Sequence, residues 1–141
     1  IGICNGFQIL IEAGLLPGAL IVNKNIKFIS KNVTLKVNSS NSIFTSKLNN
    51  NEKLVMPIAH KEGNYIANDL ILEKLQKDDR IIFKYDTDGE NANPNGSMLD
   101  IAGIINKKRN ILGMMPHPER ASDSVLGLSD GSNIFKSILG Q

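Results

Sequence analysis

The sequence is poor in several residue types, and each scarcity excludes a class of protein. Cys4 is the only cysteine among 141 residues, so no internal disulfide can stabilise the chain. The formal net charge is only +2, and just three of the 16 basic residues are arginines, which does not favour a nucleic-acid partner. No apolar run approaches the ~18 residues that a membrane span requires. We therefore expect no nucleic-acid and no membrane partner, and the cytoplasm as the location.

Histidine is also scarce, which leaves few candidates for a metal ligand or a general base. The two histidines, His60 and His117, are each followed two residues later by glutamate. A zinc site would need a further histidine or Cys4 at ligand spacing, and the sequence has no such motif. The stretch DTDGE at residues 86–90 lacks the later acidic positions of a calcium loop. We expect no metal and interpret that stretch as a turn.

Hydrophobic periodicity predicts alternating helices and strands in one domain. The length suits a single core, and no linker or internal repeat divides the chain. Residues 6–13 have helical spacing, whereas residues 27–37 alternate between apolar and polar positions. The remaining predicted elements are strands at 53–59, 80–85, 98–106 and 110–115 and helices at 68–77 and 131–139. We therefore predict one α/β domain over residues 1–141.

The chain begins with a pattern typical of a nucleophile elbow. Cys4 lies between Gly2 and Gly6, where an apolar run turns into a helical pattern. Glycines at such a turn avoid clashes with the backbone, and a helix N-terminus lowers the pKa of a thiol. The N–H of Asn5 would then help to stabilise an oxyanion. A buried structural cysteine beside a glycine turn remains an alternative at this point.

Either histidine could act as the base for such a thiol. In extended chain, a glutamate two residues later lies on the same side and can hold the imidazole through Nδ1. Two features favour His117: prolines flank it, and the preceding ILGMM is the more uniformly apolar strand. His60 is followed by Lys61 and Gly63, which indicates a mobile surface turn.

Two stretches carry a family resemblance. GICNGFQILIEAGLLPGAL and GMMPHPER resemble the class I glutamine amidotransferases, and PIAHKEGNY and NPNGS support the resemblance. It implies a flavodoxin-like three-layer sandwich with a mostly parallel central sheet. It also implies that residues 1–141 are the C-terminal two thirds of the domain. The N-terminal strands, with the second oxyanion donor, would then precede Ile1.

The resemblance also implies roles for particular residues. Cys4 would be the nucleophile, His117 its base and then acid, and Glu119 the residue that orients His117. Gln8 matches a position that helps to hold the substrate glutamine. Lys61 departs from the family, which commonly has glycine there, and this leaves the role of the loop His60–Glu62 open.

The implied reaction is hydrolysis of glutamine to glutamate and ammonia, with ammonia passing to a synthetase partner. Asn5, Phe7 and NPNGS favour the family members that serve purine biosynthesis. In these, a synthetase subunit uses ATP and Mg²⁺ and a small accessory subunit joins the complex, so we expect no cofactor in this chain. Alternatives are a cysteine hydrolase on a related α/β fold, a binding subunit without activity, or another class I glutaminase subunit.

Overall fold

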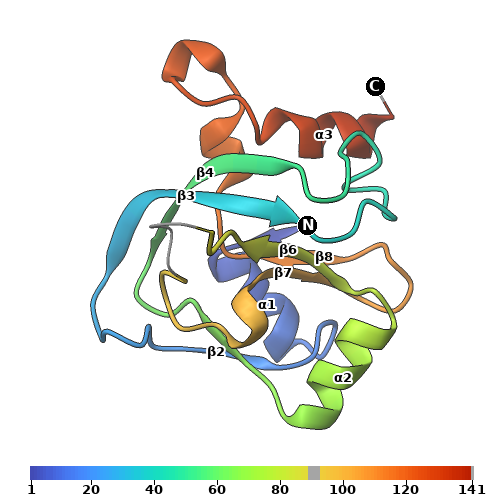
Figure 1. Ribbon diagram of the computed structural model, residues 1–141. Helices are drawn as coiled ribbons and strands as arrows, with labels where there is room; N and C mark the ends of the chain where they lie inside the picture. Colours follow the sequence, from blue (N-terminus) through green and yellow to red (C-terminus); the bar gives the residue numbers. More distant parts are fainter. Residues whose placement is uncertain (89–92, 141) are drawn as a thin grey trace.

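The computed structural model describes residues 1–88 and 93–140, and a mixed sheet forms its centre (Figure 1). The six strands of this sheet follow the order β1-β8-β7-β6-β3-β4. A separate two-stranded sheet pairs β2 with β5. The strands are β1 (Gly2–Ile3), β2 (Ala19–Ile21), β3 (Ile29–Val37), β4 (Lys53–His60), β5 (Asn64–Ile66), β6 (Ile81–Tyr85), β7 (Ile101–Ile105) and β8 (Leu112–Met114). The helices are α1 (Asn5–Glu12), α2 (Asp69–Lys77) and α3 (Ser132–Leu139), with short 3-10 helices η1 (Met98–Asp100), η2 (Pro118–Ala121) and η3 (Ser124–Leu126).

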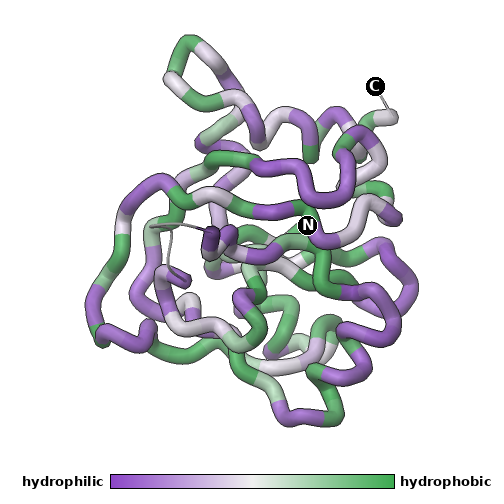
Figure 2. The backbone as a smooth tube through the Cα atoms, in the orientation of Figure 1, coloured by the Kyte–Doolittle hydropathy of each residue, from purple (hydrophilic) through white to green (hydrophobic). Residues whose placement is uncertain are grey.

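Apolar side chains pack on both faces of the main sheet and give three layers. Ile104 and Ile105, neighbours in β7, belong to two different core clusters because successive side chains of a strand point to opposite faces. Phe7 of α1 and Leu75 of α2 complete one cluster, and Ile134 of α3 completes the other. Figure 2 shows a run of hydrophilic residues along the turn between β7 and β8 and hydrophobic residues in α1. The predicted α/β three-layer architecture is confirmed.

The expectation of a mostly parallel sheet is wrong for this chain. Among the described strands only β1 and β8 pair in parallel, and the other four pairings of the main sheet are antiparallel. The connections explain this: β7 reaches β8 through the short turn at residues 106–111, and a short turn can only join antiparallel strands. The strands predicted at 98–106 and 110–115 therefore form a hairpin whose turn contains residues 107–109.

Most predicted elements form close to their predicted positions. The helix after Cys4 ends at Glu12, and Asn68 caps α2 by accepting a hydrogen bond from the Ile71 N–H at 2.9 Å. Pro57 lies in β4, an edge strand, as its missing N–H requires. The structure differs from the prediction in two respects. It contains β2 and β5, for which there is no prediction, and residues 98–100 form η1 rather than the predicted strand. The turn predicted at residues 86–90 includes residues 89 and 90, which lie outside the described part.

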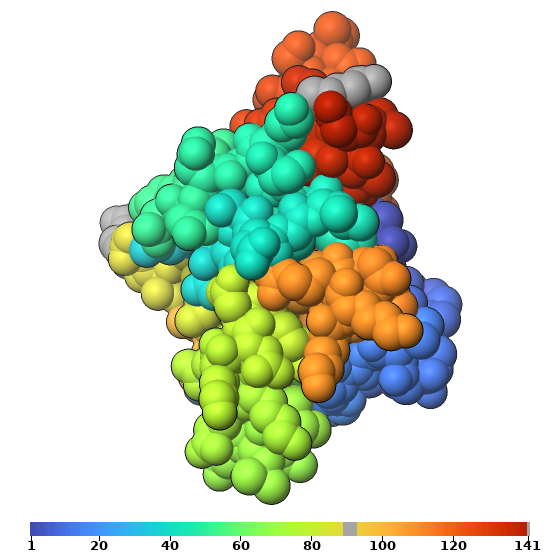
Figure 3. Space-filling view, turned by 90° about the vertical axis from the view of Figure 1, so that its right-hand side faces the viewer, coloured from blue at the N-terminus to red at the C-terminus, as the bar shows by residue number. Residues whose placement is uncertain are grey.

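The loop at residues 38–51 covers one face of the molecule between α3 and the turn after β7 (Figure 3). The Lys47 N–H donates to Ser137 Oγ at 3.0 Å, and Arg109 Nε donates to the Asn41 carbonyl at 2.6 Å. These bonds attach the loop to α3 on one side and to the turn on the other. No helix in residues 1–88 and 93–140 is long and apolar enough to cross a membrane.

Candidate active site

The chain makes a sharp, strained turn at Cys4. The Cys4 N–H extends the parallel pairing of β1 with β8 by donating to the Met114 carbonyl at 2.8 Å. Cys4 itself has φ 51° and ψ −107°, a conformation that residues with a side chain rarely adopt. The next residue, Asn5, begins α1. The predicted strand–turn–helix elbow is confirmed, and the strain lies at the predicted nucleophile, as is common at functional sites.

The two glycines beside Cys4 are not equivalent. A Cβ on Gly2 would lie 2.5 Å from the Gly6 carbonyl oxygen and 2.5 Å from Leu10 Cδ1, so position 2 has no room for a side chain. A Cβ on Gly6 would meet nothing within 4 Å apart from its chain neighbours and the backbone of its own helix. The prediction that a side chain would clash with the backbone is therefore confirmed for Gly2. For Gly6 it is wrong, because a Cβ there would clash with none of the described residues.

Burial dominates the acidity of the thiol. It raises the pKa of Cys4 above its ordinary value, and the Glu119 charge acts in the same direction. The backbone N–H of Asn5, at the start of α1, and the charge of Arg120 lower it by less. The expected net lowering by the helix N-terminus is therefore wrong for this structure. A thiol with a raised pKa needs a base to remove its proton before it can attack.

His117 is held in an orientation suited to a base. Its Nδ1 lies 2.6 Å from Glu119 Oε1, and its backbone N–H donates to the Pro57 carbonyl at 2.9 Å. Glu119 reaches the ring through the 3-10 turn of η2 rather than through the predicted extended chain. His117 is 6% exposed, and its buried Nε2 has no hydrogen-bond partner among the described residues.

The parallel pairing of β1 with β8 brings the two predicted residues to one edge of the sheet. Cys4 directly follows β1, and His117 follows β8 by three residues. The Cys4 Sγ itself lies 3.8 Å from the Ala59 carbonyl oxygen, so in this structure the thiol points toward the end of β4.

His60 is buried, so its assignment to a mobile surface turn is wrong. The residue is only 4% exposed, and its Nδ1 lies 3.1 Å from Asn23 Oδ1. Asn23 Oδ1 also accepts from the Gly63 N–H, while Asn23 Nδ2 donates to the carbonyls of Lys27 and His60. Because this network fixes the orientation of the Asn23 amide, His60 must donate through Nδ1–H. Its buried Nε2, which has no partner among the described residues, is then a lone-pair acceptor.

Burial also keeps His60 neutral. It lowers the pKa of His60 to about 4, and nearby His117 acts in the same direction. An amide oxygen at Nδ1 supplies no negative charge to stabilise an imidazolium, whereas the Glu119 carboxylate at His117 does. The structure therefore favours His117 over His60 as the base.

Buried amides fix the turn after β4. The Gly63 carbonyl accepts from Asn95 Nδ2 at 2.8 Å and from Ser97 Oγ at 3.1 Å, and the Asn23 N–H donates to the Lys61 carbonyl at 2.8 Å. Sequence reasoning missed Asn23, because nothing distinguishes it from the other 16 asparagines. Asn95 lies in NPNGS, a stretch whose only signal in the sequence is the family resemblance.

A pocket of about 240 Å³ opens at the elbow. Its lining comes from the elbow with the first turns of α1 and from the end of β4 with its turn, and consists of Cys4, Asn5, Gln8, His60, Lys61 and Glu62. Gln8 Nε2 donates to Glu12 Oε1 at 3.1 Å, which leaves Gln8 Oε1 as an acceptor. Cys4, Asn5 and Gln8 are thus brought together, while His117 and Glu119 are not part of this lining.

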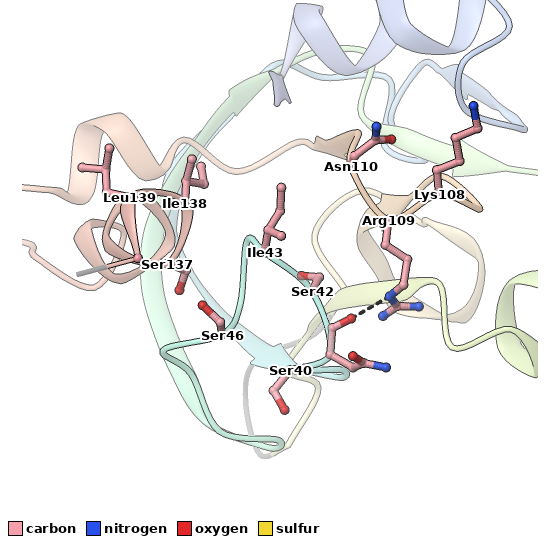
Figure 4. Close-up of a pocket in the computed structure, with 12 residues that line it drawn as sticks. Ser40, Ser42, Ile43, Ser46, Lys108, Arg109, Asn110, Ser137, Ile138 and Leu139 are labelled. Carbon is pink, nitrogen blue, oxygen red and sulfur yellow. Dashed lines mark hydrogen bonds between the residues drawn. The ribbon is translucent and has the colours of Figure 1, made fainter.

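A larger hollow of about 690 Å³ lies elsewhere, between the 38–51 loop, Arg109 and the end of α3 (Figure 4). None of the predicted site residues lines it. Arg109 contributes a cation, but its guanidinium already donates to the carbonyls of Asn41, Asp78 and Asp79. The pocket at Cys4 is the one that combines a nucleophile with unpartnered polar groups.

Comparison with known proteins agrees with the class that the elbow and its histidine define. Residues 1–128 match the family described as the CobB/CobQ-like glutamine amidotransferase domain, and the chain belongs to that family. A curated relative is phosphoribosylformylglycinamidine synthase subunit PurQ from Koribacter versatilis (strain Ellin345), which is 56% identical over 144 residues. The match covers 99% of this chain and 62% of the relative.

Solved structures agree with the fold. A chain in the structure of PurLQS from Thermotoga maritima is 43% identical, with a TM-score of 0.84 over 98% of this chain and 59% of that one. A Thermoplasma acidophilum protein assigned to GMP synthase is 18% identical, with a TM-score of 0.59 over 98% of this chain and 54% of its own. The latter likeness shows the fold alone. The chain spans about three fifths of the length of the Koribacter versatilis relative and of the Thermotoga maritima chain.

Proposed function

We propose that this chain carries the glutamine-hydrolysing site of a phosphoribosylformylglycinamidine synthase. One observation carries the proposal: a strained elbow presents Cys4 at the sheet edge where His117 is held by Glu119. The 56% identity to a PurQ subunit supports the particular reaction.

The proposed chemistry is acyl transfer through a thioester. His117 Nε2 takes the proton of the Cys4 thiol while Sγ attacks the side-chain amide carbon of glutamine. The carbon–nitrogen bond then breaks, and His117 returns the proton to the departing nitrogen, which leaves as ammonia. Water, deprotonated by His117, hydrolyses the glutamyl thioester and releases glutamate and the thiol.

Asn5 and Gln8 can also take part in these reaction steps. The Asn5 N–H, at the start of α1, lowers the pKa of the Cys4 thiol and can donate to the oxyanion of each tetrahedral intermediate. Gln8, in the same pocket, presents Oε1 as an acceptor for an N–H group of the substrate. Glu119 stabilises the imidazolium that forms each time His117 holds the extra proton.

Ammonia would be used by a partner in the cytoplasm. In the proposed complex a synthetase subunit of the PurL type, with ATP and Mg²⁺, converts formylglycinamide ribonucleotide to formylglycinamidine ribonucleotide, and a small PurS-type subunit completes the assembly. The assembly named PurLQS, which contains a structural relative, supports this arrangement. The sequence has no G-x-x-x-x-G-K-[ST] phosphate loop, consistent with ATP use by the partner.

Isotope transfer tests the proposal. The full-length protein, its synthetase partner, ATP, formylglycinamide ribonucleotide and glutamine labelled with ¹⁵N at the side-chain amide should yield labelled formylglycinamidine ribonucleotide. A Cys4→Ala variant should abolish glutamine-dependent synthesis but leave synthesis from added ammonium intact. Equal glutamine-dependent rates for both proteins would refute the proposal. Transfer of the label to another acceptor only would instead indicate a different synthetase partner.

A further inference from the structure

The turn between β2 and β3, residues 22–28, exposes three large apolar side chains at the left edge of Figure 1. Ile26 is 73% exposed and Phe28 is 63% exposed, and Val22 is exposed as well. A single exposed apolar residue is ordinary on a protein surface, whereas several together are typical of a surface that contacts another molecule.

The backbone of this turn is strained and fixed. Ile26 has φ 62°, a conformation that is rare for a residue branched at Cβ. Its N–H donates to the Asn23 carbonyl at 2.7 Å, and Asn23 Nδ2 donates to the Lys27 carbonyl at 2.8 Å. Because these bonds hold a strained residue with its apolar side chain in solvent, the turn presents a pre-organised surface, which reduces the entropy cost of binding.

The charge of the turn limits what can cover it. Lys24 and Lys27 are exposed and form no ion pair with any residue in the described part of the chain, and residues 22–28 include no acidic residue. A second copy that met the same patch across a two-fold axis would place lysines against lysines, which is unfavourable. The complementary surface is an apolar recess with acidic residues at its rim.

The turn is attached to the pocket that contains Cys4. Asn23 Oδ1 lies 3.1 Å from His60 Nδ1 and accepts from the Gly63 N–H at 3.0 Å. Ile29, directly after the turn, is the strand partner of His60, which lines the pocket. Ammonia that escapes into neutral water is protonated and no longer acts as a nucleophile, so a partner that uses it must adjoin this pocket.

We propose that residues 22–28 are a docking surface for the synthetase partner, with Ile26 and Phe28 inserted into an apolar recess and Lys24 and Lys27 facing acidic residues at its rim. This inference rests on the proposed function and adds the part of this chain that the partner recognises.

Titration of the full-length protein into a fixed amount of its synthetase partner tests the assignment. In the double variant Ile26→Asn/Phe28→Gln, the concentration that gives half-maximal glutamine-dependent synthesis should rise about tenfold or more, with an unchanged rate at saturation. Asparagine tolerates a positive φ, so the change at position 26 should not impair folding. Lys24→Glu should slow association, and this effect should shrink at high salt.

Leu70→Gln is the matched control. It removes an apolar side chain that is 68% exposed on α2, at the lower right of Figure 1, and should leave the titration unchanged. An unchanged half-saturation in the double variant would overturn the docking surface while leaving the proposed function intact. Absence of glutamine-dependent synthesis with the wild-type proteins would overturn both.

Two further measurements exclude other occupants of the turn. If the double variant keeps its synthetase affinity but loses binding to phosphatidylserine vesicles, or loses self-association in sedimentation velocity, the turn contacts a membrane or a second copy, and the proposal is overturned. A lower denaturation midpoint for Ile26→Asn in the full-length protein alone would show that another part of the same chain covers the turn, with the same consequence.

Discussion

The chain contains two His-x-Glu segments at the ends of strands, and the structure gives them different chemistry. His117 has a carboxylate oxygen of Glu119 at 2.6 Å from Nδ1, whereas His60 has the amide oxygen of Asn23 at 3.1 Å. Both imidazoles are buried, and each has an Nε2 without a partner among the described residues. The difference lies in the group behind the ring, since a carboxylate stabilises an imidazolium and a neutral amide does not.

The tripeptide pattern alone therefore does not define a base. Glu119 contacts its histidine because a 3-10 turn folds it back. Among the described residues Glu62 forms no hydrogen bond or ion pair with His60, and it lines the pocket instead. We therefore attribute proton transfer in the proposed reaction to the segment 117–119, whereas the segment 60–62 lines the pocket at Cys4.

The largest expected difference is in turnover. His117→Asn removes the proposed base and should lower kcat for glutamine at least about 10³-fold. His60→Asn retains an amide N–H near Asn23 and should lower kcat less than about tenfold. Steady-state kinetics on the full-length complex measure both, with circular dichroism as a check of folding. Equal losses in the two variants would contradict the assignment of different roles.

Removing the charge behind His117 should have the next largest effect. Glu119→Gln keeps an oxygen that can accept from Nδ1–H but no longer stabilises an imidazolium. Because the Glu119 side chain is 44% exposed, water compensates in part, and we expect kcat to fall about 10²-fold. A kcat within twofold of wild type would show that the carboxylate is not needed.

Substitution of a glycine that packs against each His-x-Glu segment tests how tightly that segment is packed. A Cβ on Gly131 would lie 2.2 Å from the Pro118 carbonyl oxygen, and one on Gly63 would lie 2.2 Å from His60 Cε1. We expect either alanine variant to lose about 1–3 kcal/mol of unfolding free energy. Gly6→Ala is the matched control, since it adds a side chain in open space within a helix and should gain about 0.5–1 kcal/mol. Denaturant titration measures all three, and a stable Gly63→Ala variant would show that the ring can move.

The smallest effect concerns acid stability. The pKa of His60 is about 4 in the folded protein, against 6.5 for the unfolded chain. As the pH falls from 6.5 toward 4, the unfolded state binds a proton that the folded state does not, so the folded state loses stability. We expect His60 to contribute a loss of on the order of 1–2 kcal/mol over this range. His60→Gln should flatten the dependence, and an unchanged slope would show that His60 is accessible to protons.

The sequence was sufficient for features that depend on local pattern. The elbow at Cys4 and the pairing of His117 with Glu119 each involve residues within a few positions of one another. The amphipathic helices and the alternation in β3 were also visible, because burial on one face leaves a period in the sequence.

Features that depend on distant contacts could not be predicted. The burial of His60 requires Asn23, 37 positions away, and an asparagine in an asparagine-rich chain gives no signal of that contact. The antiparallel pairing follows from how strands are connected in space, which the resemblance to a mostly parallel fold misrepresented. The raised pKa of Cys4 depends on burial by other segments, which outweighs the local effect of α1.

Covalent labelling with an electrophilic glutamine analogue tests the central claim most directly. The full-length protein with its partner would be treated with the analogue, digested and analysed by mass spectrometry. We predict one adduct, on Cys4, that glutamine suppresses in competition and that forms more slowly in the His117→Asn variant. An adduct elsewhere, or labelling of Cys4 that glutamine does not suppress, would contradict the assignment of Cys4 as the nucleophile of a glutamine site.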